Sequence, residues 1–488
     1  MNFCKSMEQV LEFSGKRVYI APYTPKTTMF ASELQEQHSF TFLGFLDNFQ
    51  EGANISKPSQ IDKEFDLILI LSANHGNAIF EDFSTKLPRS KLVKVEENHG
   101  MYRFLETQEV EQSLKKERVT KRKQLFLKRF ASLLDTLSYK REKIVFISKG
   151  SITSNNKALF IHCFKEGLDA VMLTDNIAQL QELKTLGMSV VHLESWHAYF
   201  LMACAKITVQ DQANLTVEIN LLSPRQKSLQ MWHGIPLKRL NKLTTVAYDY
   251  LVSTSDFVNE TTLSKVIDAK EYKDFGYPRN DLFLKENHDA YDLLFCDKTI
   301  YNFAKEKFGT EHKIALYMPT HRESSKAAKI PLDFEKLNIF LAQNNTTLIL
   351  KLHHFVQELY EYKSYSNILF HAIHGDVYPL LKYTDILITD YSSVYFDFLL
   401  LNRPIIFFDY DKEEYEANMQ GFLYDYESFT PGVHAMNQEA LHQALKQTLT
   451  CHEDEFKEQR ELLCAKLYSY RDALSSQRIA QLLGDKDV

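Results

Sequence analysis

Short apolar runs alternate with longer amphipathic stretches along this sequence, and this alternation constrains the fold more than any other feature. The run Leu67–Leu71 is typical of a strand that is buried on both faces, and the stretches between runs repeat apolar residues at helical spacing. Parallel strands need crossovers that are usually helices, which produces this order along a chain. The sequence therefore predicts α/β domains with parallel sheets. The apolar runs stay far below the ~18 residues of a membrane-spanning helix.

The chain has 488 residues, which is too long for one hydrophobic core and predicts several domains. We expect a small Rossmann-like module over residues 1–105 and a basic helical linker over residues 106–142. Two further Rossmann-like domains are expected over residues 143–275 and 276–488, and the second would end in C-terminal helices. Ligands of doubly wound sheets bind beyond the carboxyl ends of the strands, so two such domains facing each other would enclose a binding cleft.

Composition and charge narrow the class of protein. With 44% hydrophobic and 25% charged residues the chain is of globular type, and its net charge of -7 argues against a nucleic-acid-binding protein. The six cysteines are scattered without a CxxC pair, which argues against a zinc knuckle or a disulfide framework. A reducing cytoplasm fits this cysteine usage, and residues 1–10 lack the apolar core of a signal peptide.

Polar side chains follow the ends of several predicted strands, where they would line the cleft. They combine imidazole, guanidinium, ammonium and hydroxyl groups, which suit a phosphate-rich ligand. The set consists of His233, Lys238, Arg279, Thr320, Arg322, Lys351, His353, Ser392 and Ser393. The sequence contains no glycine-rich phosphate loop and no Gly-x-Ser-x-Gly elbow, which weakens the kinase, dehydrogenase and hydrolase hypotheses.

Several candidates also have a structural interpretation, and the sequence leaves both open. His233 could accept a proton at neutral pH or simply pack, and Gly234 beside it would let the backbone approach a ligand closely. Ser392 and Ser393 precede a predicted helix and could bind an anion or act as an ordinary N-cap. Asp397, one turn further on, could hold a ligand hydroxyl or favour the helix N-terminus. The histidines have no acidic or thiol partner at ligand spacing, so we expect no metal site.

A sustained basic segment covers residues 115–129 and includes the apolar residues Leu125 and Phe126. One interpretation is a solvated linker helix that packs one stripe of side chains on a neighbour. The other is a surface that attracts anionic lipid or a polyanionic acceptor, because each basic residue near an anionic surface contributes about 1 kcal/mol. The pattern alone does not decide between them.

A series of motifs in a fixed order carries a family resemblance. The motifs are Ser-Asn-Asn-Lys-Ala-Leu from Ser154, Gln-Met-Trp-His-Gly-Ile-Pro-Leu-Lys from Gln230, Gly-Tyr-Pro-Arg-Asn-Asp from Gly276, Met-Pro-Thr-His-Arg from Met318, Lys-Leu-His from Lys351, and Thr-Asp-Tyr-Ser-Ser from Thr389 followed by Phe396 and Asp397. Over residues 143–435 the chain resembles the CDP-glycerol glycerophosphotransferase family of teichoic-acid and capsule polymerases and primases. The resemblance implies an α/β fold in which a GT-B-like pair of Rossmann-like domains faces a cleft, preceded by the small extra α/β module.

The resemblance also implies an activity and a set of site residues. The activity is transfer of a polyol phosphate, glycerol phosphate first, from a CDP-activated donor to a hydroxyl of a teichoic-acid-like or capsular polymer, with release of CMP and no cofactor or metal. In this family the histidine of the Trp-His-Gly motif is the proposed base, which gives that role to His233. The implied substrate contacts are Gly234, Pro236, Lys238, Arg279, Thr320, Arg322, Lys351, His353, Ser392, Ser393 and Asp397.

The sequence departs from the family pattern at His321, His354 and Gln420, which leaves the donor open. The alternatives are CDP-ribitol and a nucleotide sugar used by a GT-B glycosyltransferase. A scaffold without activity is disfavoured because the candidate catalytic residues are present. The expected partners are the CDP-polyol donor, a lipid-linked or polymeric acceptor and an anionic membrane surface, with self-association left open. We therefore expect a cytoplasmic enzyme that is bound peripherally to the inner face of the cell membrane.

Overall fold

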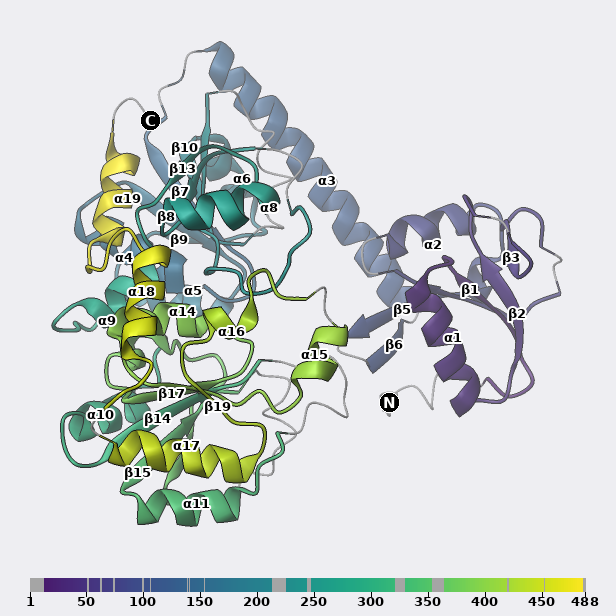
Figure 1. Ribbon diagram of the computed structural model, residues 1–488. Helices are drawn as coiled ribbons and strands as arrows, with labels where there is room; N and C mark the ends of the chain where they lie inside the picture. The colour runs from purple at the N-terminus through teal and green to yellow at the C-terminus, as the bar shows by residue number, and fades with distance from the viewer. Residues whose placement is uncertain are drawn as a thin grey trace. The chain divides into compact units, whose positions relative to one another are not determined.

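The structure is a computed structural model of the chain. It describes residues 13–485 except 51, 62–63, 73–74, 99–100, 106, 138, 140, 153, 213–224, 244–246, 321–329, 353–363, 419–420 and 452. The chain divides into two compact units within helix α3 (Thr107–Thr136), the first ending at Arg122 and the second beginning at Lys123 (Figure 1). None of the described helices is long and apolar enough to cross a membrane.

The first unit is built on a six-stranded sheet. Its strands lie in the order β3 (Ile55–Ser56), β2 (Thr41–Leu46), β1 (Arg17–Ala21), β4 (Leu67–Leu71), β5 (Leu92–Asn98) and β6 (Met101–Leu105). Neighbouring strands are parallel except for β5 and β6. Helices α1 (Pro25–Gln37) and α2 (Gly76–Ser84) cover opposite faces of this sheet. Alternate residues of the fully buried β4 pack into two separate cores, one with α1 and the other with α2.

The second unit contains two lobes, each built on a parallel sheet. The first-lobe strands lie in the order β13 (Ala269–Lys273), β12 (Tyr248–Val252), β11 (Lys227–Gln230), β10 (Ala205–Gln210), β7 (Lys143–Ser148), β8 (Ala170–Thr174) and β9 (Val190–His192). One face is covered by α4 (Ser154–Lys165) and α5 (Ile177–Thr185), and the other by the end of α3 and by α6 (Trp196–Ala203). Short helices α7 (Asp256–Val258) and α8 (Ser264–Val266) follow β12.

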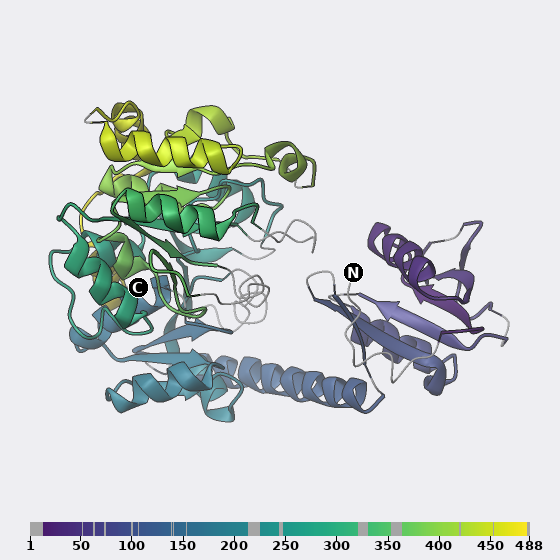
Figure 2. The ribbon, with the colours of Figure 1, turned by 90° about the horizontal axis from the view of Figure 1, so that it is seen from below.

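The second-lobe sheet has six strands. Their order is β16 (Ile368–Phe370), β15 (Thr346–Leu350), β14 (Lys313–Met318), β17 (Ile386–Thr389), β18 (Ile405–Phe407) and β19 (Val433–His434). Helices α11 (Phe334–Gln343) and α17 (Gln438–Thr450) lie on one face (Figure 1, Figure 2). The other face packs against α10 (Lys298–Lys307), α13 (Tyr378–Leu381), α14 (Val394–Phe398) and α18 (Lys457–Leu467). Helices α15 (Lys412–Asn418) and α16 (Tyr426–Phe429) precede β19. The prediction of α/β domains with parallel sheets is confirmed.

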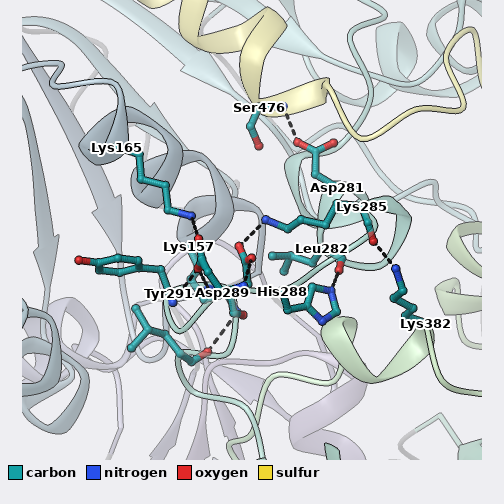
Figure 3. Close-up of polar contacts among 12 residues, drawn as sticks. Lys157, Lys165, Asp281, Leu282, Lys285, His288, Asp289, Tyr291, Lys382 and Ser476 are labelled. Atoms are coloured by element: carbon teal, nitrogen blue, oxygen red, sulfur yellow. Dashed lines mark hydrogen bonds and ion pairs between the residues drawn. The ribbon is translucent and has the colours of Figure 1, made fainter. Parts of the chain in front are cut away.

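The chain crosses between the lobes twice. The first crossing includes α9 (Pro278–Leu284). Figure 3 shows the polar contacts that fasten α9 and the segment after it to α4, to the residue that follows α13 and to the end of the chain. The second crossing leads to α19 (Ser475–Gly484), whose Ile479 and Leu483 enter the core of the first lobe. The N–H groups of Ser475 and Ser476 both donate to the Asp281 carboxylate, at 2.9 and 2.7 Å. The last helix therefore packs on the first lobe, although it follows the second lobe in sequence.

Candidate active site

A cleft of about 610 Å³ opens between the two lobes of the second unit. The first lobe contributes the loop that follows β11, from Trp232 to Leu240, and the second lobe contributes the segments that follow β14, β15 and β17. These segments are the carboxyl ends of parallel strands, where ligands of doubly wound sheets bind. The cleft agrees with the one expected between two facing domains.

The loop that carries His233 has an unusual backbone. Trp232 has a φ of 56° and Gly234 a φ of 135°, both in the left-handed region. The Trp232 N–H donates to Gln230 Oε1 at 2.8 Å, and its carbonyl accepts from Asn155 Nδ2 at 2.8 Å. Because a bulky residue at positive φ costs about 1–3 kcal/mol, such contacts are needed to hold the loop in place. The loop presents His233 to the cleft, with its ring centroid 3.9 Å from that of Trp232.

The imidazole of His233 is neutral at neutral pH. The side chain is open to the cleft, but the surrounding protein withholds water from the ring and lowers its pKa to about 4. The positive charge of Arg279 acts in the same direction, and a contact with the Asp211 backbone partly offsets both. A neutral imidazole has a free ring nitrogen that can accept a proton, which is the property a general base needs.

Arg279 lies behind this loop. Its Nη1 donates to the His233 carbonyl at 2.5 Å and its Nη2 to Asp397 Oδ2 at 2.5 Å. Asp397 also accepts hydrogen bonds from the hydroxyls of Tyr378, at 3.1 Å, and Tyr468, at 3.3 Å. The Arg279 and Asp397 side chains are 7% and 1% exposed, so they form a buried ion pair. Burial alone would lower the pKa of Arg279, but the adjacent carboxylate raises it and keeps the guanidinium charged.

The second-lobe wall of the cleft carries Thr320 and Lys351. The Thr320 N–H donates to Asp390 Oδ1 at 2.8 Å, which ties the segment after β14 to the segment after β17. Lys351 Nζ donates to the carbonyls of residues 372 and 373, each at 2.6 Å. Burial lowers the pKa of Lys351 to about 8, so its charge is close to titrating at neutral pH.

Ser392 and Ser393 also line this wall, just before α14. Ser393 has a helical backbone conformation, and its side chain makes no capping hydrogen bond to any described residue. The ordinary N-cap interpretation therefore does not hold for Ser393. Both serines are half-buried, and a hydroxyl that faces a cleft can donate to or accept from a ligand.

The structure brings most of the predicted site residues to the cleft. The residues that line it are His233, Gly234, Pro236, Lys238, Thr320, Lys351, Ser392 and Ser393. Lys238 Nζ lies 5.1 Å from the centroid of the Tyr415 ring. Arg279 and Asp397 are buried and do not line the cleft. Arg322, His353, His321, His354 and Gln420 lie outside the described residues. Within the described part of the chain, no group of three His, Cys, Asp or Glu side chains is arranged to hold a metal ion.

Several residues around the cleft were not singled out from the sequence. Asn155 links the loop to Arg279, since its Nδ2 donates to the Trp232 carbonyl and its Oδ1 accepts from the Arg279 N–H at 3.1 Å. Asp211 is fully buried, and this burial raises its pKa to about 7. The motif that begins at Ser154 was a signal for Asn155, whereas no pattern in the sequence marks Asp211 or Tyr378.

Comparison with known proteins identifies a family. A family model described as CDP-glycerol:poly(glycerophosphate) glycerophosphotransferase matches residues 129–484. A teichoic acid poly(glycerol phosphate) polymerase of Bacillus spizizenii is 36% identical over 284 residues, which cover 52% of this chain and 69% of that protein. A protein of the same description from Bacillus subtilis is 26% identical over 451 residues, which cover 83% of this chain and 59% of that protein.

The fold also has a solved counterpart. The wall teichoic acid polymerase TagF superposes with a TM-score of 0.58 at 21% identity, over 78% of this chain and 98% of that structure. This likeness concerns the fold, and it confirms the predicted GT-B-like arrangement. The family that the motifs indicated is confirmed by the family model and by the relative that is 36% identical. The chain therefore belongs to the CDP-glycerol:poly(glycerophosphate) glycerophosphotransferase family, and it is an enzyme of the CDP-glycerol glycerophosphotransferase type.

Proposed function

We propose that this enzyme transfers glycerol phosphate from CDP-glycerol to a hydroxyl of a lipid-linked or polymeric teichoic-acid-like or capsular acceptor, with release of CMP. The observation that carries the proposal is the position of His233, whose neutral imidazole opens into a cleft opposite Lys351 and the serine pair. Relatives named teichoic acid poly(glycerol phosphate) polymerases support the acceptor class, and a TagF crystal soaked with CDPG supports the donor.

In this mechanism the acceptor hydroxyl attacks the phosphorus that bears the glycerol. A new P–O bond forms, the bond from that phosphorus to the bridging diphosphate oxygen breaks, and CMP leaves with the bonding electron pair. His233 takes the proton of the attacking hydroxyl, as a general base. Charge that builds on the phosphoryl oxygens is stabilised by preorganised donors on the opposite wall.

The donor diphosphate would be held by the second-lobe wall. Thr320, Lys351, Ser392 and Ser393 line it, and the motif residues Arg322 and His353 belong to segments that follow the same strands. We assign these residues to donor contacts, and Gly234, Pro236 and Lys238 of the first lobe to the acceptor side of the cleft. The set offers ammonium, guanidinium, imidazole and hydroxyl groups, which match the oxygens of a diphosphate.

CDP-ribitol is the second candidate donor. A teichoic acid poly(ribitol-phosphate) polymerase of Bacillus spizizenii is 34% identical over 184 residues, which cover 35% of this chain. Both donors share the CDP group and differ only in the polyol, so the same cleft wall could serve either. The preference between the two donors is therefore tested by comparing CMP release from each.

We also propose that the enzyme works at an anionic membrane surface through α3 and α6. Leu127, Ala131 and Leu134 of α3 are buried against the first lobe, as a linker helix would be. A second set of apolar side chains on α3 and α6 stays exposed, at Leu125, Phe126, Leu133, Trp196 and Phe200. Apolar and aromatic side chains beside basic residues are typical of surfaces that bind anionic bilayers.

The test of the proposed function is a donor screen. Purified enzyme is incubated with CDP-glycerol, CDP-ribitol, UDP-glucose and GDP-mannose, with and without a polyol-phosphate primer, and release of the nucleotide is measured. We expect CMP release from CDP-glycerol that depends on the primer. Release from a nucleotide sugar alone would contradict the proposal.

A variant at the proposed base completes the test. His233→Ala should lower turnover by about 100- to 10,000-fold, the usual contribution of a general base, and should leave CDP-glycerol binding in calorimetry nearly unchanged. Because the pKa of His233 is lowered to about 4, the wild-type rate should not fall between pH 8 and pH 6 through protonation of this residue. Near-normal turnover of the variant would remove His233 from the role of base.

A further inference from the structure

The loop that carries His233 is held from behind by residues that belong to other parts of the fold. Asn155 of α4 binds the Trp232 carbonyl, and Arg279 of α9 binds the His233 carbonyl. Asn155 and Arg279 are themselves joined by the hydrogen bond from the Arg279 N–H. The carbonyls of the two peptide bonds on either side of the His233 Cα atom are therefore each fixed by a buried side chain.

Arg279 in turn is fixed by the second lobe. Asp397 of α14 binds its Nη2, and the Tyr378 ring of α13 lies 4.7 Å from the guanidinium carbon. Tyr468, which follows α18, donates its hydroxyl to the other oxygen of Asp397. The guanidinium also approaches Gly234 so closely that a Cβ atom there would lie 2.6 Å from Nη2. The guanidinium thus connects the catalytic loop of the first lobe to the core of the second.

We propose that Arg279 and Asp397 act as a positioning pair, which sets the place and orientation of His233 according to the position of the second lobe. The proposal rests on the proposed role of His233 as the base. A displacement of about 1 Å of a reacting group can cost about 100-fold in rate, so a base on a strained loop gains from a rigid support.

Arg279 also affects the pKa of His233 through its charge. Its charge lowers the pKa of His233, while Asp397 lies behind it. Another titratable group at this loop is Asp211, whose backbone contacts the His233 ring and whose pKa burial raises to about 7. Removal of the Arg279 charge should therefore raise the pKa of His233, whereas a lysine in its place should not.

Two variants separate geometry from charge. Arg279→Lys keeps a positive charge but lacks the planar fork that reaches both the His233 carbonyl and Asp397. The double variant Arg279→Gln with Asp397→Asn removes both charges, so that no unpaired buried charge is left to unfold the protein. The matched control is Asp454→Asn, which removes the carboxylate partner of another buried arginine, Arg460, at a place that does not line the cleft.

The measurements are the turnover of CDP-glycerol, its KM, and the titration of the His233 ring by NMR of the full-length protein labelled at histidine, with His233→Gln used for assignment. We expect turnover of both variants to fall by about 10- to 100-fold, with little change in KM. The pKa of His233 should rise in the double variant and stay unchanged in Arg279→Lys. The same titration in an Asp211→Asn background should give the same rise.

Other outcomes would overturn the proposal. Weaker binding of CDP-glycerol with normal turnover would make Arg279 a donor contact, and an equal loss of turnover in Asp454→Asn would make the effect one of stability. The NMR titration does not depend on activity. A wild type that shows the expected titration but does not use CDP-glycerol would contradict the proposed function and not the electrostatic link between Arg279 and His233.

Discussion

At position 234 only glycine fits, for two separate reasons. Its φ of 135° is accessible to glycine and strained for any other residue, and the Arg279 guanidinium occupies the place of a Cβ atom. The guanidinium cannot yield easily, because Asp397 and the His233 carbonyl hold both of its ends. The sequence suggested that Gly234 allows a close approach of a ligand, and the structure shows close approach of a buried side chain.

Gly234→Ala should therefore lower turnover by about 100-fold, because the loop must move away from Arg279 by a large part of an ångström. The matched control is Gly309→Ala, since Gly309 has a φ of 79° but nothing near the added Cβ. The control should lose about 1–3 kcal/mol of stability and keep its turnover. Steady-state CMP release and thermal unfolding measure the two effects, and equal turnover of both variants would argue against the contact.

At the scale of elements, the short helix α14 shows how a helix start is used. It has five residues, and Ser393 before it does not cap it through its side chain. The helix is held instead by burial of its own residues, from Val394 to Phe398. The hydroxyls at its start are thus available to a ligand, and their removal should not loosen the helix.

Ser392→Ala combined with Ser393→Ala should leave the melting temperature nearly unchanged, because no capping bond of Ser393 is lost. The double variant should bind CDP-glycerol more weakly, by about 1–3 kcal/mol for lost hydrogen bonds to charged oxygens, while CMP binding changes less because CMP lacks the outer phosphate. Calorimetry with both ligands is the measurement. Equal losses for CDP-glycerol and CMP would place the serines at the nucleotide.

Helix α3 is an element with two apolar sets of side chains. The buried set packs on the first lobe and accounts for the linker interpretation, while the exposed set lies beside Lys128 and Arg129. Some basic residues are already engaged, since Lys121 pairs with Glu117 and Lys123 lies 5.6 Å from the Trp196 ring centroid. Arg118 pairs with Glu81 of the first unit, whereas the side chains of Arg122, Lys128 and Arg129 are exposed.

Changing Lys121, Arg122, Lys123, Lys128 and Arg129 to Gln should reduce sedimentation with vesicles of phosphatidylglycerol, because each basic residue near such a surface contributes about 1 kcal/mol. CMP release with a short soluble primer should stay nearly the same. High salt should reduce binding of the wild type in the same way, since it screens the attraction. If the variant sediments as well as the wild type at low salt, α3 is a linker helix only.

For the whole molecule, the buried ion pair between Lys157 and Asp376 joins the lobes. Lys157 of α4 also donates to the carbonyls of residues 292 and 294, at 3.0 and 3.1 Å, and Ser154 Oγ donates to Asp376 at 2.9 Å. Burial alone would raise the pKa of Asp376, but the Lys157 ammonium and these hydrogen bonds outweigh it and lower the pKa. Two motif residues without an assigned role, Ser154 and Lys157, thus hold the lobes together.

Asp376→Asn should lower the free energy of unfolding by about 3–5 kcal/mol at pH 7, because it leaves Lys157 charged, buried and without its carboxylate. The matched control, Asp289→Asn, loses the exposed pair that Lys165 of the same helix makes and should cost about 0–1 kcal/mol. A carboxyl group whose pKa is lower in the folded than in the unfolded protein stabilises the fold at pH values where it is ionised. The difference between wild type and Asp376→Asn in urea unfolding should therefore shrink as the pH falls through the folded pKa of Asp376.

By itself the sequence determined the class of fold and the family, and it predicted eight of the residues that line the cleft. These properties depend on local patterns, because periodicity records which face of an element is buried and a motif keeps its order along the chain. The half-exposed edge strand β13 carries no strand signal, because its sequence, Ala-Lys-Glu-Tyr-Lys, has no apolar run. Only the tertiary structure decided that α19 packs on the first lobe and that Arg279 pairs with Asp397, 118 residues away. The physical reason is that a buried charge needs a partner, and which partner it meets depends on where the chain returns in space.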